Sequence, residues 1–220
     1  LPLLKNISNE KTIVITIQNG VNSHNEISKF IDRKQIIPAA TFIEAEIESP
    51  GVILQQGSTA ILEMGYLEKS QEKILQDLKN KFDSEFLSFK ISDDIFYTLW
   101  KKMIIVGAFG TIMTSFRMSF RELIDSKYGE KILSETMKEI KKVGIAEKIK
   151  LGTVNISEII EELRAEADEM TSSMFNDLKN GKPLEIDSIL GYVVNLAKLK
   201  NIDLPYSQTL VSSLENFKEG

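Results

Sequence analysis

The sequence predicts the end of an α/β layer followed by an all-helical domain, and two observations support this fold class. Runs rich in β-branched apolar residues, such as residues 12–17, are concentrated in residues 1–91 and are typical of strands buried in a parallel sheet. From residue 92 onward the apolar residues recur at helical spacing, without a repeat of fixed period. We therefore divide the chain into an α/β part, residues 1–91, and a helical domain, residues 92–220.

The α/β part begins with the strand at residues 12–17. This strand is followed by Asn19 and Gly20, which favour a tight turn because both residue types tolerate positive φ. His24 follows in a polar run, where we expect an exposed loop or the start of a helix over residues 25–31. We also expect a turn, a surface helix and further strands: the turn at 49–51, the helix at 67–82, and strands at 36–42, 44–48, 52–57, 58–64 and 86–91.

The helical domain is expected to open with a helix from Asp93, whose acidic first turn suits the helix dipole, to about Thr114. Gly144, Gly181 and Pro205 are expected to end helices, because Gly favours the left-handed conformation past a helix end and Pro cannot continue a helix. The other helices are expected at residues 121–125, 129–144, 157–180, 185–200 and 207–217.

Composition excludes several kinds of site. The chain of 220 residues has a net charge of -5 and no strip of Lys and Arg, so no nucleic-acid partner is expected. It contains no Cys and a single His, which excludes disulfides, thiolate nucleophiles, His-based triads and multi-His metal sites. No uninterrupted apolar run approaches about 20 residues, so no membrane partner is expected. The absence of Cys suits a reducing compartment, and we expect a cytoplasmic protein without a bound metal.

Residues 99–108 contain the most informative stretch, because Lys101 and Lys102 lead directly into an apolar helical run. Desolvation lowers the pKa of a Lys, so a partly buried Lys here could donate a proton near neutral pH. Alternatively, both lysines lie with their stems on the core and their ammonium groups in water. Ligand sites favour clefts between domains and the carboxyl ends of strands, and we expect Asn19 and Lys102 to face such a cleft.

Four stretches of the chain resemble the ketopantoate reductase (2-dehydropantoate 2-reductase) family. The first three are residues 13–20 with their Gln-Asn-Gly end, residues 41–51, and residues 100–102 followed by an apolar helix. The fourth is the most specific and comprises Thr171, Ser172, Ser173, Met174, Phe175, Asn176, Asp177, Gly181, Glu185, Ile186, Asp187 and Gly191. The resemblance implies the last strands of a Rossmann-type NADP-binding domain, followed by a helical substrate domain of the 6-phosphogluconate dehydrogenase C-terminal-like type.

The resemblance also implies a reaction and roles for individual residues. The reaction is NADPH-dependent reduction of a 2-oxo acid such as ketopantoate to its 2-hydroxy acid, pantoate, on the pantothenate and coenzyme A pathway. Lys102 matches the general acid, Asn19 a residue that contacts cofactor and substrate, and Ala45 a residue on the cofactor side. Ser173 matches a substrate hydrogen-bond donor, and Glu185 an acid that meets the cofactor ribose and the catalytic Lys.

Each polar position also has a local interpretation that requires no ligand. Asn19 could be only a turn residue. Ser173 and Asp177 are four residues apart and could pair on one helix face. Glu185 could begin the next helix, where an acid is favoured by the dipole.

Two features of the sequence differ from the family pattern. The chain begins at Leu1 and lacks the Gly-x-Gly-x-x-Gly turn, so we expect a fragment that on its own is inactive and holds NADPH poorly. Val106, Gly110 and Met170 stand where the best-known members carry Asn. The alternatives are therefore a paralogue that reduces a different 2-oxo acid or a more apolar ketone, and a non-catalytic helical binding or dimerisation module. Homodimer formation is left open.

Overall fold

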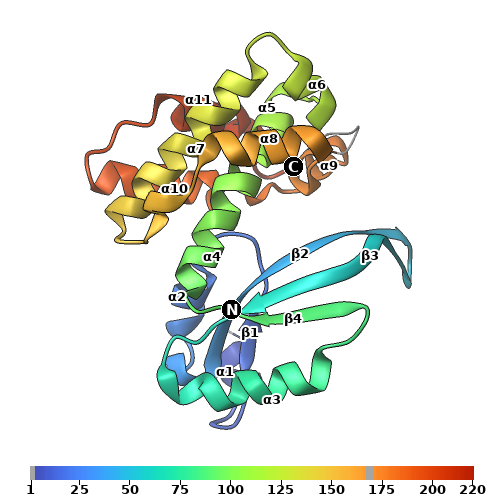
Figure 1. Cartoon of the computed structure of the whole chain (residues 1–220), viewed down its shortest axis with the longest axis vertical. Coiled ribbons are helices and arrows are strands. Elements are labelled where there is room, and N and C mark those ends of the chain that lie inside the picture. The colour runs from blue at the N-terminus through green and yellow to red at the C-terminus, as the bar shows by residue number, and fades with distance from the viewer. Residues whose placement is uncertain (1–2, 167–170) are drawn as a thin grey trace. The chain divides into compact units, whose positions relative to one another are not determined.

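Two compact units make up the structure, a computed structural model that describes residues 3–166 and 171–220 (Figure 1). The first unit comprises Leu1–Leu99 and the second Trp100–Gly220. A small mixed sheet in the first unit is followed by a mostly helical second unit, which confirms the expected fold class. Met170, one of the positions that differ from the family pattern, lies outside the described residues.

The first unit contains a four-stranded sheet in the order β1-β2-β3-β4 (Figure 1). β1 runs parallel to β2, β2 and β3 form an antiparallel hairpin, and β3 runs parallel to β4. The expected turn between the hairpin strands is confirmed, since Gly51 has a φ of 84°. The strands are β1 (Val14–Thr16), β2 (Ile36–Ser49), β3 (Val52–Met64) and β4 (Leu87–Ile91).

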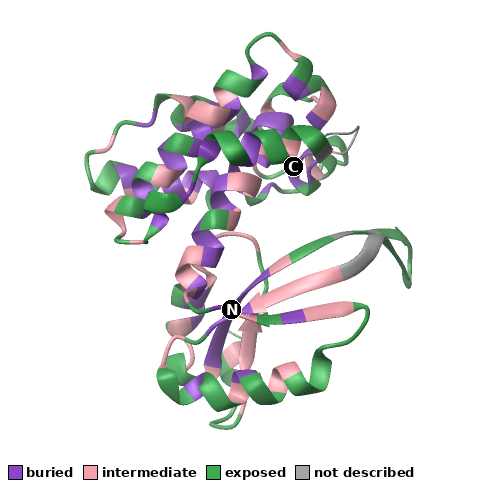
Figure 2. Ribbon diagram, viewed as in Figure 1, coloured by how far each residue is buried: buried purple, intermediate pink, exposed green. Residues whose placement is uncertain are grey.

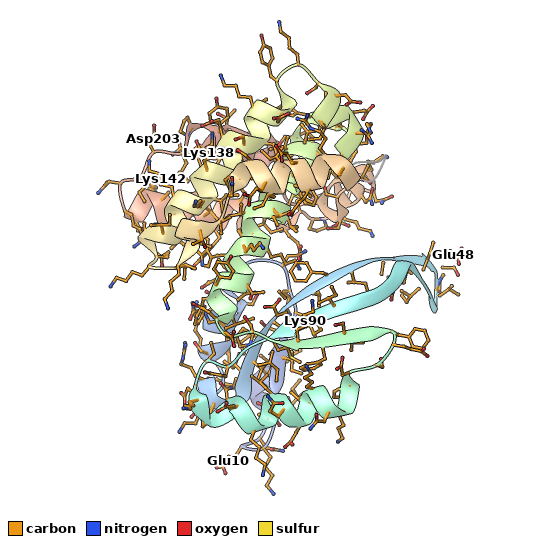
Figure 3. All side chains as sticks on the ribbon, viewed as in Figure 1. Glu10, Glu48, Lys90, Lys138, Lys142 and Asp203 are labelled. Atoms are coloured by element: carbon orange, nitrogen blue, oxygen red, sulfur yellow. The ribbon has the colours of Figure 1, made fainter. Side chains whose placement is uncertain are left out.

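β1 differs from the expected strand, which was to be buried on both faces. It is only three residues long and half-buried, because within the described residues it pairs with β2 alone. The strands expected at 36–42 and 44–48 form one continuous strand, β2, and its distal part pairs with β3. Apolar side chains on this distal hairpin are exposed: Ile47 is 75% exposed and its cross-strand partner Ile53 is 64% exposed. Figure 3 shows Glu48 at the tip of this hairpin.

The sheet core lies between the strands and helix α3 (Glu72–Phe82). Its buried residues come from β2, β3, α3 and β4, namely Ile37, Ala39, Met64, Leu75 and Phe89. Gln71 precedes α3 and is buried; its side-chain Nε2 donates a hydrogen bond of 2.8 Å to the Ile36 carbonyl. Gln71 therefore ties the start of α3 to the start of β2. The remaining short elements of this unit are α1 (Leu4–Ile7), α2 (Ser23–Ser28), η1 (Arg33–Gln35) and η2 (Lys69–Gln71).

His24 lies in the first turn of α2 and is only 5% exposed, so the expectation of an exposed residue was wrong. Its ring packs edge-on against Phe96, with 5.3 Å between ring centroids. The polar neighbours of His24 in the sequence concealed this contact, which comes from a residue far along the chain. Burial, with a smaller contribution from the Arg33 guanidinium, lowers the pKa of His24 from 6.5 to about 4.

The second unit is built around α7 (Gly129–Ala146), which contacts α5, α6, α8, α10 and α11. Figure 2 shows buried residues concentrated where these helices pack. The helical elements are α4 (Ile95–Lys102), whose last residues belong to this unit, the π-helix η3 (Met103–Gly107), α5 (Ala108–Phe116), α6 (Phe120–Asp125), η4 (Leu151–Thr153), α8 (Ile156–Glu166), α9 (Ser173–Lys179), η5 (Glu185–Asp187), α10 (Leu190–Leu199), α11 (Pro205–Leu214) and η6 (Glu215–Phe217).

Three expected helix ends differ from the structure. Gly144 does not end α7 but lies inside it, at a contact where an added Cβ would come within 2.4 Å of Leu151 and 2.8 Å of Trp100. Pro205 begins α11 instead of ending a helix, since its fixed φ suits the first helical position. The helix expected over 157–180 is two helices, α8 and α9. Gly181 does follow the end of α9, with a φ of 60°.

Glu139 of α7 fixes the start of α11 through buried hydrogen bonds. Its carboxylate accepts bonds from the backbone N–H of Tyr206 (3.0 Å) and Ser207 (2.7 Å) and from the Ser207 hydroxyl (2.6 Å). A carboxylate at a helix N-terminus satisfies backbone donors that have no partner within the helix. The central helix therefore sets where α11 begins.

One continuous helical run among the described residues, Ile95–Phe116, is 22 residues long and apolar enough to cross a membrane by length and composition. Most of its window, 61%, is buried inside the structure, and the core helix of a soluble protein passes the same test. The run contains Lys101 and Lys102, which is why no uninterrupted apolar stretch of this length was expected. It is weak evidence for a membrane span.

The pKa of His24 can be tested directly, because the chain contains a single histidine. We expect the imidazole proton resonance in NMR spectra to titrate with a midpoint near pH 4, because burial against Phe96 disfavours the charged ring. The same protein unfolded in urea is the control and should titrate near 6.5. A midpoint near 6.5 in the folded protein would show that the ring is exposed.

Candidate functional site

The residues expected at the site belong to both units. Asn19 and Ala45 lie in the first unit, whereas Lys102, Ser173 and Glu185 lie in the second. The structure describes each group within its own unit. The expected convergence of Asn19 with Lys102 therefore stays a prediction.

Lys102 is the last residue of α4 and is half-buried, whereas Lys101 is exposed. Trp100 and Met103 on either side of the lysine pair are buried in the core of the second unit. Burial lowers the pKa of Lys102, and the negative charge of Glu185 partly opposes this shift. The alternative, in which the lysine ammonium groups lie in water, thus fits the exposed Lys101. Lys102 is the better candidate for a proton donor.

The π-helix η3 begins directly after Lys102. Gly107 ends it in a tight contact, since an added Cβ would come within 2.7 Å of the Met103 sulfur and 3.4 Å of Ile189. The carbonyl of Gly107 accepts a hydrogen bond of 2.8 Å from the Thr111 hydroxyl. Single π turns inside helices are frequent at functional sites. Here the close contacts at Gly107 leave no room for a side chain at the end of the turn.

Glu185 begins the short turn η5, between the buried residues Leu184 and Ile186. Its carbonyl accepts bonds from the Ser188 N–H (3.1 Å) and the Ser188 hydroxyl (3.0 Å). Glu185 therefore starts a separate 3₁₀ turn. The local interpretation, in which Glu185 begins the next helix, was wrong, since α10 begins at Leu190. Its exposed carboxylate acts electrostatically on Lys102 from this turn.

Ser172, which the sequence analysis placed in the fourth family stretch without assigning it a role, forms the N-cap of α9 and joins it to α5. Its hydroxyl accepts a bond from the Phe175 N–H (3.1 Å), donates to the Gly110 carbonyl (3.2 Å) and lies 3.3 Å from the Thr114 hydroxyl. The signal available in the sequence was a Ser at the start of a helix. The neighbouring candidate, Ser173, is exposed at the first position of α9.

Gly110, one of the positions that differ from the family pattern, faces the N-cap of α9. An added Cβ would lie 3.6 Å from Ser172 Cβ and 3.9 Å from its Oγ, which are ordinary contacts. Val106 is half-buried within η3, one turn beyond Lys102. The helix surface that follows Lys102 therefore presents an apolar side chain at 106 and none at 110.

Asn19 follows β1 in a bend and is half-buried; Gly20 beside it has a φ of 105°. This position confirms the expected turn after the first strand. Ala45 is exposed on the β2–β3 hairpin, opposite Gln55.

An open cavity of about 570 Å³ lies between α7, η4 and the start of α8 and contains none of the expected site residues. Figure 3 shows two of its lysines, Lys138 and Lys142, on the surface of α7. Across residues 3–166 and 171–220, no group of three or more His, Asp or Glu side chains is arranged to hold a metal ion.

The coupling of Lys102 to Glu185 can be measured by NMR on ¹³C-methylated lysines, with Lys102 assigned through Lys102→Arg. We expect Lys102 to titrate below 10.5, and Glu185→Gln to lower its pKa further, because the opposing carboxylate charge is removed. The matched control is Glu161→Gln on the exposed face of α8, which should leave the titration unchanged. An unchanged pKa in Glu185→Gln would refute the coupling.

Two family models match this chain and together cover both units. Residues 94–218 match the family described as "Ketopantoate reductase PanE/ApbA C terminal", and residues 1–69 match "Ketopantoate reductase PanE/ApbA". A 2-dehydropantoate 2-reductase from Pyrococcus horikoshii is 27% identical over 194 residues, which are 88% of this chain and 63% of the relative. A 2-dehydropantoate 2-reductase from Streptococcus pyogenes is 25% identical over 217 residues, which are 98% of this chain and 70% of the relative. The chain therefore spans less than two thirds of the Pyrococcus relative.

Solved structures under 25% identical share the fold. A D-mandelate dehydrogenase with NADH and anilino(oxo)acetate has a TM-score of 0.88 and 24% identity, over 98% of this chain and 70% of its own. A 2-dehydropantoate 2-reductase from Geobacter metallireducens has a TM-score of 0.89 and 19% identity, over 97% and 71%. A Staphylococcus aureus ketopantoate reductase described as dimeric has a TM-score of 0.85 and 20% identity, over 99% and 72%. Because the C-terminal family match alone covers more than half of its residues, this chain belongs to the ketopantoate reductase PanE/ApbA family.

Proposed function

We propose that the protein is an NADPH-dependent reductase that converts a 2-oxo acid, such as ketopantoate, to the 2-hydroxy acid. The observation that carries this proposal is the half-buried Lys102 directly before the π-helix η3, with a pKa that burial lowers and the charge of Glu185 partly restores. The names of the Pyrococcus and Streptococcus relatives support the same reaction class. The activity proposed is that of the intact protein, since this chain spans 63% of the Pyrococcus relative.

Lys102 is the proposed proton donor. When bound, the reduced nicotinamide supplies a hydride to the carbonyl carbon, and negative charge then develops on the carbonyl oxygen. The Lys102 ammonium gives that oxygen a proton, so that one hydride and one proton complete the alcohol. Glu185 counteracts the effect of burial and keeps Lys102 protonated over a wider pH range.

Asn19, Glu185 and Ser173 supply the polar groups proposed to hold the ligands. Asn19, in the bend after β1, offers an amide to the nicotinamide end of the cofactor and to the substrate. Glu185 offers a carboxylate to a ribose hydroxyl, and the exposed Ser173 hydroxyl donates to the substrate. Ala45 is proposed on the cofactor side. These residues suit the nicotinamide-ribose end of NADPH, and the 220 residues contain no Gly-x-Gly-x-x-Gly turn for its pyrophosphate.

A second candidate function is reduction of a 2-oxo acid with an apolar side chain. It is favoured by Val106 and Gly110, which provide no amide donor on the helix beyond Lys102. One structural neighbour is described as a D-mandelate dehydrogenase with NADH and anilino(oxo)acetate. We also retain a cytoplasmic location and a homodimer as proposals, the latter because the Staphylococcus aureus neighbour is described as dimeric.

Activity of the intact protein tests the proposal. With NADPH and a panel of 2-oxo acids, Lys102→Ala should lower kcat by roughly 10²- to 10⁴-fold, because general acid catalysis contributes about this much. The matched control is Lys101→Ala, at the exposed neighbouring position, which should change kcat less than about twofold.

Two outcomes would contradict the proposal. If the intact wild-type protein neither binds nor oxidises NADPH, the alternative of a non-catalytic helical module is favoured. If Lys102→Ala retains full activity, the proton comes from another group. Comparison of ketopantoate with an aromatic 2-oxo acid in the same assay decides between the two substrate classes.

A further inference from the structure

The turn that carries Glu185 is held on both sides by one residue near the C-terminal end of this sequence, Lys218. On one side, the Leu184 N–H donates a hydrogen bond of 3.0 Å to the Lys218 carbonyl. On the other side, the Lys218 ammonium forms an ion pair with the Asp187 carboxylate. Glu185 lies between these two attachments in the sequence and in η5.

Lys218 is itself well anchored. It follows η6, where the Lys218 N–H donates to the Glu215 carbonyl at 3.4 Å. The guanidinium of Arg117, which caps α5, lies 5.3 Å from the centroid of the Phe217 ring. The segment that holds η5 is therefore joined to the helix that follows the π turn after Lys102.

Burial alternates along η5 and fixes which side chains face outward. Leu184 and Ile186 are buried, whereas Glu185 and Asp187 are exposed. The two apolar side chains fix the backbone of the turn, and the exposed carboxylates are left to respond to charge. An exposed ion pair contributes little to stability, so we expect loss of the Asp187–Lys218 pair to leave the fold intact.

We propose that Asp187 and Lys218 are positioning residues, whose ion pair orients the η5 turn so that the Glu185 carboxylate acts on Lys102. Neither side chain is required to touch substrate or cofactor. The catalytic consequence of this inference rests on the proposed function, but the effect on Lys102 does not, because it can be measured without a substrate.

The surrounding charges allow the contribution of the pair to be separated. Lys102 experiences the charge of Glu185, and Lys218 experiences those of Asp187, Glu215 and Glu219. The hydrogen bond from Lys218 to Asp187 raises the pKa of Lys218, so the pair persists across the neutral and mildly alkaline range. The exposed Lys101, beside Lys102 on α4, is common to every variant and cancels in the comparison.

The test is a double-mutant comparison in the intact protein, read as the pKa of Lys102 by NMR on ¹³C-methylated lysines. Asp187→Asn and Lys218→Met should each lower that pKa, because Glu185 is then less well oriented toward the ammonium. In the Glu185→Gln background, Asp187→Asn should have no further effect. The matched control is Lys182→Met, whose ammonium lies 3.9 Å from Asp177 in another exposed pair and which should leave Lys102 unchanged.

Two results would overturn the proposal. One is an unchanged Lys102 pKa in both Asp187→Asn and Lys218→Met. The other is an equal shift from Asp187→Asn with and without Glu185, which would mean that Asp187 acts on Lys102 directly. Lys218→Arg keeps the ion pair and should retain the wild-type pKa of Lys102. If Lys218→Arg shifts this pKa as much as Lys218→Met does, the shift comes from misfolding and not from loss of the pair.

A parallel activity assay separates this inference from the proposed function. With a 2-oxo acid and NADPH, Asp187→Asn should lower kcat roughly two- to fivefold at alkaline pH, as expected for loss of an exposed pair. If the NMR shift is present but Lys102→Ala keeps full activity, the positioning is correct and the proposed role of Lys102 is wrong. If the shift is absent while Lys102→Ala is inactive, the proposed role of Lys102 is correct and the positioning inference is wrong.

Discussion

The partial burial of one ammonium group is the constraint on which the candidate site depends. Lys102 ends α4 among buried neighbours, and burial disfavours its charge, whereas Glu185 favours it. Such a balance makes proton affinity sensitive to small movements of either group. The π turn η3 directly follows Lys102, and Glu185 begins the short turn η5.

Close packing of helices determines what can stand beyond Lys102. Gly107 ends the π turn against Met103 and Ile189, and the Gly110 carbonyl accepts the Ser172 hydroxyl that caps α9. An added Cβ would clash with the Met103 sulfur at Gly107 but would make only ordinary contacts at Gly110. Val106 and Gly110 offer no amide donor beyond Lys102, which is the basis of the apolar substrate class proposed.

Periodicity predicted the elements far better than it predicted their ends. Alternation and the Pro-Gly turn predicted the β2–β3 hairpin, and helical spacing predicted α3 and α7, because these patterns reflect local burial. The predictions for Gly144 and Pro205 were wrong because residue type alone does not specify what decides their places. Gly144 lies inside α7 at a tertiary contact, and Pro205 occupies the first position of α11. His24 was misjudged for the same reason, since Phe96 covers it.

The candidate site was likewise predictable only in part: Lys102 and Glu185 were identified by resemblance, and the structure adds that they are electrostatically coupled. The tie between Lys218 and the η5 turn was not predictable, because it joins segments far apart in the chain through a backbone carbonyl and a side chain.

The pH dependence of kcat/KM for 2-oxo acid reduction by the intact protein tests the central claim most directly. The account predicts that the rate falls as pH rises through the pKa of Lys102, at a pH below 10.5, because the proton donor is lost. It also predicts that this fall moves to lower pH in Glu185→Gln. A profile that shows no such fall, or a fall that is unmoved in Glu185→Gln, would contradict it.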